Sequence, residues 1–455
     1  MLVALVFAGL SGTSSPLVGQ SLTDAMISAY RYSPELASGR AALRGTDEGV
    51  AQALAATRPS LTATATGGAT FVQTPTFPTS PNWTQSATLT LSAALTLWDG
   101  GDSDLAIEVA AMSVTVGRAT LIETEQRILL SAVSAFMDMR RDARFLDLAE
   151  NNRTVIARQV QAARDRFEVG EIRRTDVSLA EARLAAALST VALRQGTLEI
   201  SREAYHVSTG HYPGALQTPP NVPGIPATLA AAKSIAMRQH PSVKRAKYLA
   251  RIAELNVFRA EAAMKPRVTM SATYGINANA ATGDTASVGL TGVQPIYQGG
   301  GLTSARRQAR ALREQARADI QLAGLLVGQN VTRFWAQLQI ARASITARQK
   351  EVRSARVALR GMQEEAKLGA RTTLDVLDAE RARLEAETNL VAAKRDEYVA
   401  VYSLLSSMGL LTVKHLHLGI ATYEPDEHYK KVYTAPGPTD RGRLLQRILK
   451  RAGKK

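Results

Sequence analysis

The segment Leu97–Gly101 (LWDGG) joins two stretches of opposite pattern, and the same junction returns 199 residues later as Ile296–Gly300 (IYQGG). Before each junction, apolar and hydroxyl side chains alternate, which is typical of a β-strand with two different faces. After each junction a helical pattern follows, over 102–168 and 301–367. The paired glycines predict a strand-to-helix corner, because glycine reaches backbone angles that other residues avoid.

The whole chain repeats itself in the same way. Ser33–Leu36 (SPEL) returns as His240–Val243 (HPSV) at an offset of 207, and the later offset of 199 indicates one eight-residue deletion in a loop. A period of about 200 residues is far longer than the 20 to 50 residues of solenoid repeats. Each copy is therefore expected to be a unit of several helices and strands.

This repeat sets the predicted domain organisation of the 455 residues. An apolar start followed by small residues predicts a signal peptide at 1–20. The first repeat covers 21–210, with helices at 21–58, 102–168 and 172–208 and strands at 60–72 and 86–98. The second covers 228–410, with helices at 228–265, 301–367 and 372–408 and strands at 267–279 and 285–297. A linker at 211–227 and a C-terminal tail at 411–455 complete the chain.

Apart from Arg267 at the start of the third strand, the four predicted strands are uncharged, and they are long enough to cross a bilayer when tilted. Four strands cannot close a membrane barrel, because the smallest barrels have about eight and open edges are excluded from hydrocarbon. Several copies must then share one barrel. Surface hairpins on a soluble domain are the alternative, because alternation is a weak signal in any one segment.

The helices carry apolar residues at intervals of seven, which predicts coiled-coil packing. Two such ladders are Val177, Leu184, Val191, Leu198, Tyr205 and Leu377, Leu384, Val391, Tyr398, Leu405. The rival interpretation is a soluble coiled-coil scaffold that uses its basic tail on nucleic acid, since 441–455 holds seven Lys or Arg and no acid.

Enzymatic chemistry finds no support in the residue pattern. The chain has no cysteine, which excludes disulfides, thiol catalysis and thiolate metal sites. Its six histidines do not have zinc-site spacing, and no nucleophile, base and orienting group can be assigned. We therefore predict no catalytic residue, no metal site and no cofactor.

The turns Val169–Gly170 and Leu368–Gly369 end corresponding long helices and are expected at one end of the helical rod. Asp375 and Asp378 follow the second turn and share one helix face. Helix capping is the plain alternative for this region, because Thr372 and Asp375 have the spacing of a capping box.

Taken together, Ser33–Leu36, His240–Val243, the corners Trp98–Gly101 and Tyr297–Gly300, and Leu368–Ala379 (LGARTTLDVLDA) resemble the TolC family of outer-membrane efflux and secretion ducts. The resemblance covers about 21–410. It implies a mainly α fold with a small β part: a duplicated helix-hairpin unit that forms a long coiled-coil barrel. This barrel continues into a trimeric, 12-stranded transmembrane β-barrel with four strands from each chain.

The resemblance also implies roles for single residues. Asp176 matches a gate position that pairs with an arginine matching Arg371, and Asp375 and Asp378 match two aspartate rings at the periplasmic entrance. Thr175 matches the hydroxyl partner of a gate tyrosine, but the position of that tyrosine is Ala366 here. We therefore expect the ion pair of Asp176 and Arg371 to hold the gate.

The partners follow from the same resemblance. A periplasmic adaptor would dock on the tips Val169, Gly170, Leu368 and Gly369, and an inner-membrane transporter of the ABC or RND class would supply the substrate. The predicted location is the bacterial outer membrane, in contact with its lipid and extending into the periplasm. The resemblance to secretion-type members favours type I protein secretion as the form of this duct, with multidrug efflux as the alternative, and no nucleic acid is expected.

Overall fold

The computed structural model describes residues 20–73, 81–277 and 283–434. Nearly all of the predicted signal peptide and the basic end of the tail lie outside these residues. The helices are α1 Leu22–Tyr32, α2 Pro34–Ala55, α3 Asp102–Glu168, α4 Arg174–Thr209, α5 Leu229–Gln239, α6 Pro241–Ala262, α7 Gly301–Lys367, α8 Thr373–Ser407 and α9 Pro425–Thr434. The strands are β1 Ser60–Gln73, β2 Pro81–Trp98, β3 Arg267–Asn277 and β4 Thr285–Val293.

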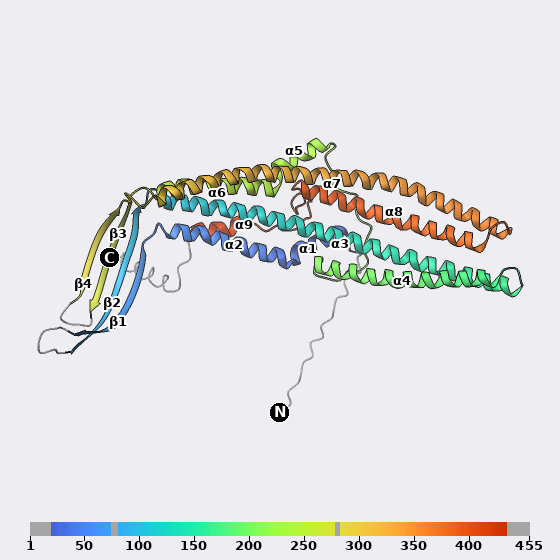
Figure 1. Cartoon of the computed structure of the whole chain (residues 1–455), viewed down its shortest axis with the longest axis horizontal. Helices are drawn as coiled ribbons and strands as arrows, with labels where there is room; N and C mark the ends of the chain where they lie inside the picture. The colour runs from blue at the N-terminus through green and yellow to red at the C-terminus, as the bar shows by residue number, and fades with distance from the viewer. Residues whose placement is uncertain (1–19, 74–80, 278–282, 435–455) are drawn as a thin grey trace, which may run out of the picture. The chain divides into compact units, whose positions relative to one another are not determined.

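The expected class, mainly α with a small β part, is confirmed. The order α1, α2, β1, β2, α3, α4 recurs as α5, α6, β3, β4, α7, α8 (Figure 1). In each copy the first helix ends at a residue with extended backbone, Ser33 or His240, and the second helix begins at the proline that follows it. The proline ring disfavours helical geometry in the residue before it. Gly100, Gly101, Gly299 and Gly300 all adopt positive φ at the strand-to-helix corners.

The chain divides into two compact units. The hairpin unit comprises 1–37, 123–240 and 327–422, and the sheet unit comprises 38–122, 241–326 and 423–455. The helices α3 and α7 contribute residues to both.

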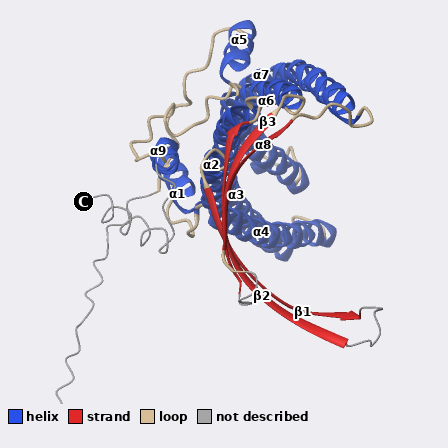
Figure 2. Ribbon diagram, turned by 90° about the vertical axis from the view of Figure 1, so that its left-hand side faces the viewer, coloured by secondary structure: helices blue, strands red, loops and turns tan. Residues whose placement is uncertain are grey.

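The sheet unit contains one antiparallel sheet in the order β1-β2-β3-β4, which is curved (Figure 2). Ala65 faces Leu89 across β1 and β2, and Ala93 faces Ala272 across β2 and β3. Apolar side chains of the sheet are exposed, including Leu61, Leu91 and Val288 at 59%, 43% and 79%. The described part of this single chain therefore leaves both β1 and β4 as open edges and an apolar surface without a cover.

The helical part of the sheet unit has its own small core. Leu43 and Val50 of α2 pack against Val114 of α3, and the tyrosines of the C-terminal segment cover them. Arg118 of α3 forms an ion pair of 2.8 Å with Asp426, and the Nδ1 of His428 lies 2.9 Å from Oδ2 of Asp47. These contacts attach α9 to α2 and α3.

By length and composition, α3 alone among the helices of the described residues could cross a membrane. Its charged side chains argue against that role, because Glu108 and Arg118 pair with Arg251 of α6 and Asp426 of α9. Charged groups are rare in membrane-spanning helices.

The core of the hairpin unit lies between its long helices. Ile156, Val160 and Ala163 of α3 pack against Ala180 and Ala187 of α4, and Leu377 of α8 joins them. The guanidinium of Arg356 on α7 donates to Glu387 on α8 at 2.7 and 2.9 Å. The α3/α4 and α7/α8 pairs are thus two helical hairpins that meet within one unit.

Candidate functional site

Both hairpins turn through the same backbone motif. Gly170 has φ of 79° and Gly369 has φ of 76°. The amide of Glu171 donates to the carbonyl of Arg166, and that of Ala370 to the carbonyl of Glu365, each at 2.9 Å. A left-handed glycine with this hydrogen bond across six residues is the Schellman ending of a helix.

The residues before these glycines are apolar and protrude into solvent. The side chain of Val169 is 71% exposed and that of Leu368 is 85% exposed. Burying either one against another protein would remove apolar surface from water, a gain of about 25 cal/mol per Å². The two turns therefore offer a pair of apolar tips.

The helix after each turn is capped by an aspartate. In α8, Oδ2 of Asp375 accepts from the amide of Thr372 at 2.9 Å and from its hydroxyl at 2.8 Å, while Thr372 Oγ1 accepts from the amide of Asp375. These hydrogen bonds, with Arg371 adding to them, lower the pKa of Asp375. In α4, Asp176 accepts from the amide of Arg173 at 3.2 Å, and Thr175 is exposed in the same first turn. The capping interpretation of the sequence thus describes the geometry of both aspartates in the single chain.

Arg371 has a partner that the sequence does not predict. Its Nε donates to Oε2 of Glu365 at 2.8 Å, and this hydrogen bond raises the pKa of Arg371. The contacts described for the single chain do not join Arg371 to Asp176. The pairing of these two residues therefore stays a prediction.

Asp378 is paired with Arg183, a residue that sequence reasoning missed. Nη2 of Arg183 on α4 lies 2.9 Å from Oδ1 of Asp378 on α8. Asp375 and Asp378 therefore follow each other on one helix but have different partners. Arg183 lies two turns after Asp176 on α4, which was the one sequence signal that pointed to it. This position does not reveal that its partner is Asp378.

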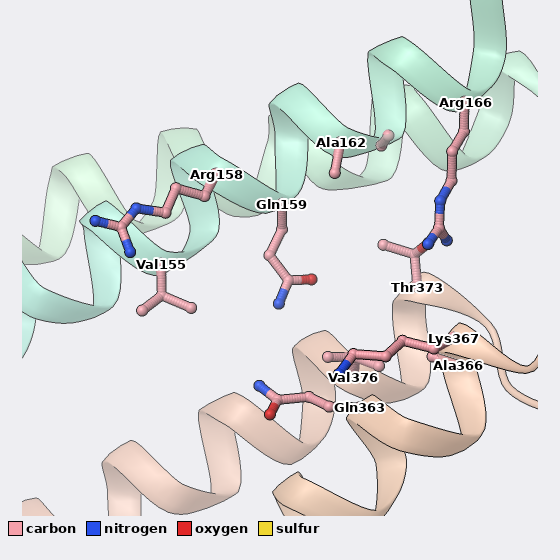
Figure 3. A pocket seen from close by; sticks show the side chains of 11 residues that line it. Val155, Arg158, Gln159, Ala162, Arg166, Gln363, Ala366, Lys367, Thr373 and Val376 are labelled. Atoms are coloured by element: carbon pink, nitrogen blue, oxygen red, sulfur yellow. The ribbon is translucent and has the colours of Figure 1, made fainter. Parts of the chain in front are cut away.

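A cleft of about 450 Å³ lies between α3 and the α7/α8 hairpin (Figure 3). Its wall includes Ala366, the position that the resemblance assigns to a gate tyrosine. In Figure 3, Arg166 points from α3 toward Thr373 on α8. The lining residues are Val155, Arg158, Gln159, Ala162, Ala163, Arg166, Gln363, Ala366, Lys367, Thr373 and Val376.

The charges of this cleft are all positive. Arg158, Arg166 and Lys367 line it. Lys367 pairs with Glu364 at 2.8 Å, and Arg166 lies 4.0 Å from Glu171. Among the residues that the structure describes, no three His, Asp or Glu side chains are grouped to hold a metal ion. The region therefore combines helix caps, exposed ion pairs and a cleft between the hairpins.

Comparison with known proteins agrees with this fold. The family model described as outer membrane efflux protein matches residues 28–211 and 233–410. Outer membrane efflux protein BepC of Brucella suis is 33% identical over 434 residues, 94% of each chain. Outer membrane protein TolC of Vibrio cholerae is 26% identical over 302 residues, 64% of this chain and 69% of that protein.

A solved structure supports the fold. The crystal structure of the outer membrane protein VceC from Vibrio cholerae matches with a TM-score of 0.72 at 21% identity, over 85% of this chain and 96% of that one. At this identity the likeness concerns the fold alone. The resemblance to TolC and the expected outer-membrane export role are both confirmed by the family match. With two matched repeats, a near full-length relative and a shared fold, the chain belongs to the outer membrane efflux protein family.

Proposed function

We propose that this protein is a trimeric outer-membrane exit duct that carries substrate from a periplasmic adaptor and an inner-membrane transporter to the outside. The carrying observation is the four-stranded sheet with open edges at β1 and β4 and an exposed apolar surface. In hydrocarbon every strand edge must be paired. Joining β4 of one copy to β1 of the next in three copies would give a closed barrel of about twelve strands, wide enough for a lumen.

An exposed ladder on α4 supports assembly from several copies. Leu179, Leu193, Ile200 and Val207 occur at multiples of seven residues and are 45%, 61%, 72% and 74% exposed. The opposite side of α4 packs inside the chain through Ala180, Ala187 and Val191, which are buried. A helix with a second apolar ladder at heptad spacing packs against another helix. We assign this second ladder to a helix of a neighbouring subunit.

The gate would lie at the start of α4 and α8. Within the chain, Arg371 is hydrogen-bonded to Glu365 of its own hairpin, and the described contacts do not join it to Asp176. We therefore place the pair of Asp176 and Arg371 across a subunit boundary. Asp375 and Asp378 of the three chains would form the acidic rings of the entrance. The exposed tips Val169 and Leu368 would dock the adaptor through apolar contact.

Efflux is the form of this function that we place first, because a relative that matches 94% of the chain is named an outer membrane efflux protein. Type I protein secretion is the other form that the sequence resemblance implies. Neither form asks the duct for chemistry of its own, because the transporter would supply the energy.

Two measurements test the proposal. Native mass determination in mild detergent should give three times the mass of one chain, which is 48.7 kDa before the predicted signal peptide is removed, and a stable monomer would overturn the duct. Ile200→Glu should reduce the trimer fraction, because it places a charge in the proposed seam, while Gln195→Glu on the exposed surface of α4 should not. Fractionation of cells distinguishes the duct from the rival interpretation, because a soluble coiled-coil scaffold would not sediment with outer membranes.

The gate has its own test in planar bilayers. Arg371→Ser should raise the single-channel conductance, because it removes the cation that would hold helices of neighbouring subunits together. Unchanged conductance would remove the gate assignment and leave the duct in place. Asp375→Ala with Asp378→Ala should abolish block by cations added on the periplasmic side.

A further inference from the structure

We propose that Arg183 and Asp378 form a clamp inside each subunit, which holds the α3/α4 hairpin to the α7/α8 hairpin beside the gate. The inference rests on the proposed gate and adds a residue to it. Arg183 acts through Asp378 by positioning α8. The contact lies wholly within the hairpin unit, and it joins residues that are 195 positions apart in the chain.

The clamp lies where the two hairpins touch only narrowly. Leu377 of α8 is 5% exposed and packs on Ile156 of α3 and Ala180 of α4. On one side is the cleft of about 450 Å³, and on the other is a second cleft of about 390 Å³. The apolar contact at Leu377 is thus flanked by clefts, and a polar contact beside it can add to what holds the hairpins together.

The second cleft places Arg183 among α3, α4 and α8. Its lining residues are Asn152, Ile156, Arg183, Ala186, Ala187, Thr190, Leu377, Arg381 and Leu384. Arg381 lies three residues after Asp378 and is the other cation of this cleft. It is therefore the side chain that could compete for Asp378, and it must be tested beside Arg183.

A second ion pair joins the same two hairpins and differs in strength. Nε and Nη2 of Arg395 on α8 donate to Oδ1 and Oδ2 of Asp138 on α3 at 2.7 and 3.1 Å, and these side chains are 23% and 27% exposed. The Arg183 and Asp378 side chains are 36% and 55% exposed and share one hydrogen bond. Bidentate, less exposed pairs are stronger and less screened by salt.

The two pairs therefore have different roles in our proposal. Asp378 and Arg395 are 17 residues apart on α8, about 25 Å at 1.5 Å per residue. The pair near the start of α8, Arg183 with Asp378, would break when α8 moves away from α4. The pair farther along α8, Arg395 with Asp138, would stay intact and act as the pivot. Because exposed ion pairs are screened, high ionic strength should favour the separated state.

The clamp also affects the entrance charge. While Arg183 neutralises Asp378, the negative potential of the entrance would come chiefly from Asp375, and opening would release a second carboxylate. Cation preference should therefore rise with opening.

The test uses the full-length trimer in planar bilayers. Arg183→Ser should raise the open fraction several-fold, because the ion pair is lost in all three subunits at once. Asp378→Asn should do the same, and exchanging the charges with Arg183→Asp plus Asp378→Arg should restore the closed state. Arg381→Ser should leave the open fraction unchanged.

Arg164→Ser is the matched control. Nη2 of Arg164 lies 2.6 Å from Oε1 of Glu181, with side chains 52% and 45% exposed, but both residues belong to the α3/α4 hairpin. This variant should not change the open fraction. An equal rise in Arg164→Ser and Arg183→Ser would overturn the clamp, because the effect would then come from losing any surface arginine.

The outcomes separate the clamp from the gate. If Arg371→Ser opens the channel and Arg183→Ser does not, the clamp is wrong and the gate stands. If neither opens it, both are wrong. Because the chain has no cysteine, Arg183→Cys plus Asp378→Cys allows a thiol crosslink at this site alone. The crosslinked duct should stay closed and reopen after cleavage of a reducible linker, and normal opening while crosslinked would overturn the clamp.

Discussion

The guanidinium of Arg371, in the turn that joins α7 to α8, donates from Nε to Oε2 of Glu365 in the last turn of α7 across 2.8 Å. An arginine has five donors, so this bond leaves others for a second partner. Glu365 thus orients Arg371 and also competes with any acid of a neighbouring subunit for it.

Glu365→Gln tests that competition. Removing the carboxylate should leave Arg371 freer to pair with Asp176 across the subunit boundary, so the closed channel should conduct less. Single-channel conductance in planar bilayers measures this. The control is Glu364→Gln, which breaks the 2.8 Å pair with Lys367 in the same turn and should leave the conductance unchanged. A rise in Glu365→Gln would mean that Glu365 holds the gate closed.

Ala366→Tyr should fill the cleft of about 450 Å³ between α3 and the α7/α8 hairpin. A ring placed there would add contact between the hairpins and a hydroxyl near the first turns of α4 and α8. We expect a lower open fraction in bilayer recordings. Ala358→Tyr, on the exposed surface of α7, is the control and should not alter gating. The idea fails if both substitutions act alike.

Thr372→Ala removes one side of the capping box of α8 and should cost about 0.5 to 2 kcal/mol in local helix stability. Hydrogen exchange of the first-turn amides of α8 should show this loss. Thr388→Ala, where the hydroxyl donates to the carbonyl of Leu384 inside α8, should slow rather than speed exchange, because alanine is the better helix former.

The cap also predicts a pH dependence. The pKa of Asp375 is lowered, so its stabilising contribution is present at neutral pH and is lost as the pH falls through that lowered value. In Thr372→Ala the protection of α8 should therefore fail at a higher pH than in the wild type. Equal midpoints in the two proteins would contradict the role of Thr372.

Gly409→Ala should destabilise the hairpin unit strongly. Gly409 has φ of 78°, and a Cβ there would lie 2.8 Å from Cα of His240 and 3.1 Å from its amide nitrogen. A left-handed residue with a side chain costs about 1 to 2 kcal/mol before this backbone clash is added. Thermal unfolding of the purified trimer measures it. Gly328→Ala, in α7 with no atom near the new Cβ, should instead stabilise by about 0.5 to 1 kcal/mol.

Sequence reasoning is most informative where the signal is local. The corner Leu97–Gly101 shows why: alternation before it and helical periodicity after it are properties of neighbouring residues, and the structure has β2 ending at Trp98 and α3 beginning at Asp102. For β4 the expected strand at 285–297 ends in the structure at Val293, two residues before Pro295. Proline lacks the amide proton that a strand needs for pairing.

The site depended on two kinds of information. The cap at Asp375 acts across three residues, so the spacing of Thr372 and Asp375 predicted its geometry, whereas the corresponding hydrogen bond of Asp176 was not predicted. The partners of Arg371 and Asp378 could not be predicted in this way. Glu364 and Glu365 precede Arg371 by seven and six residues, and the geometry of the hairpin turn decides which of them it reaches. Arg183 is one of several arginines on α4, and only the packing of α4 against α8 selects it.

The amino-acid sequence by itself thus determined the duplication, the order of helices and strands and the capping box of α8, because each follows from periodicity or local spacing, and the number of strands predicts that several copies are needed. The tertiary structure decided which charges meet: Arg371 with Glu365, Arg183 with Asp378, and Arg395 with Asp138. Long charged side chains have many possible partners at similar energy. The positions of the helix backbones, set by packing of residues such as Leu377, choose among them.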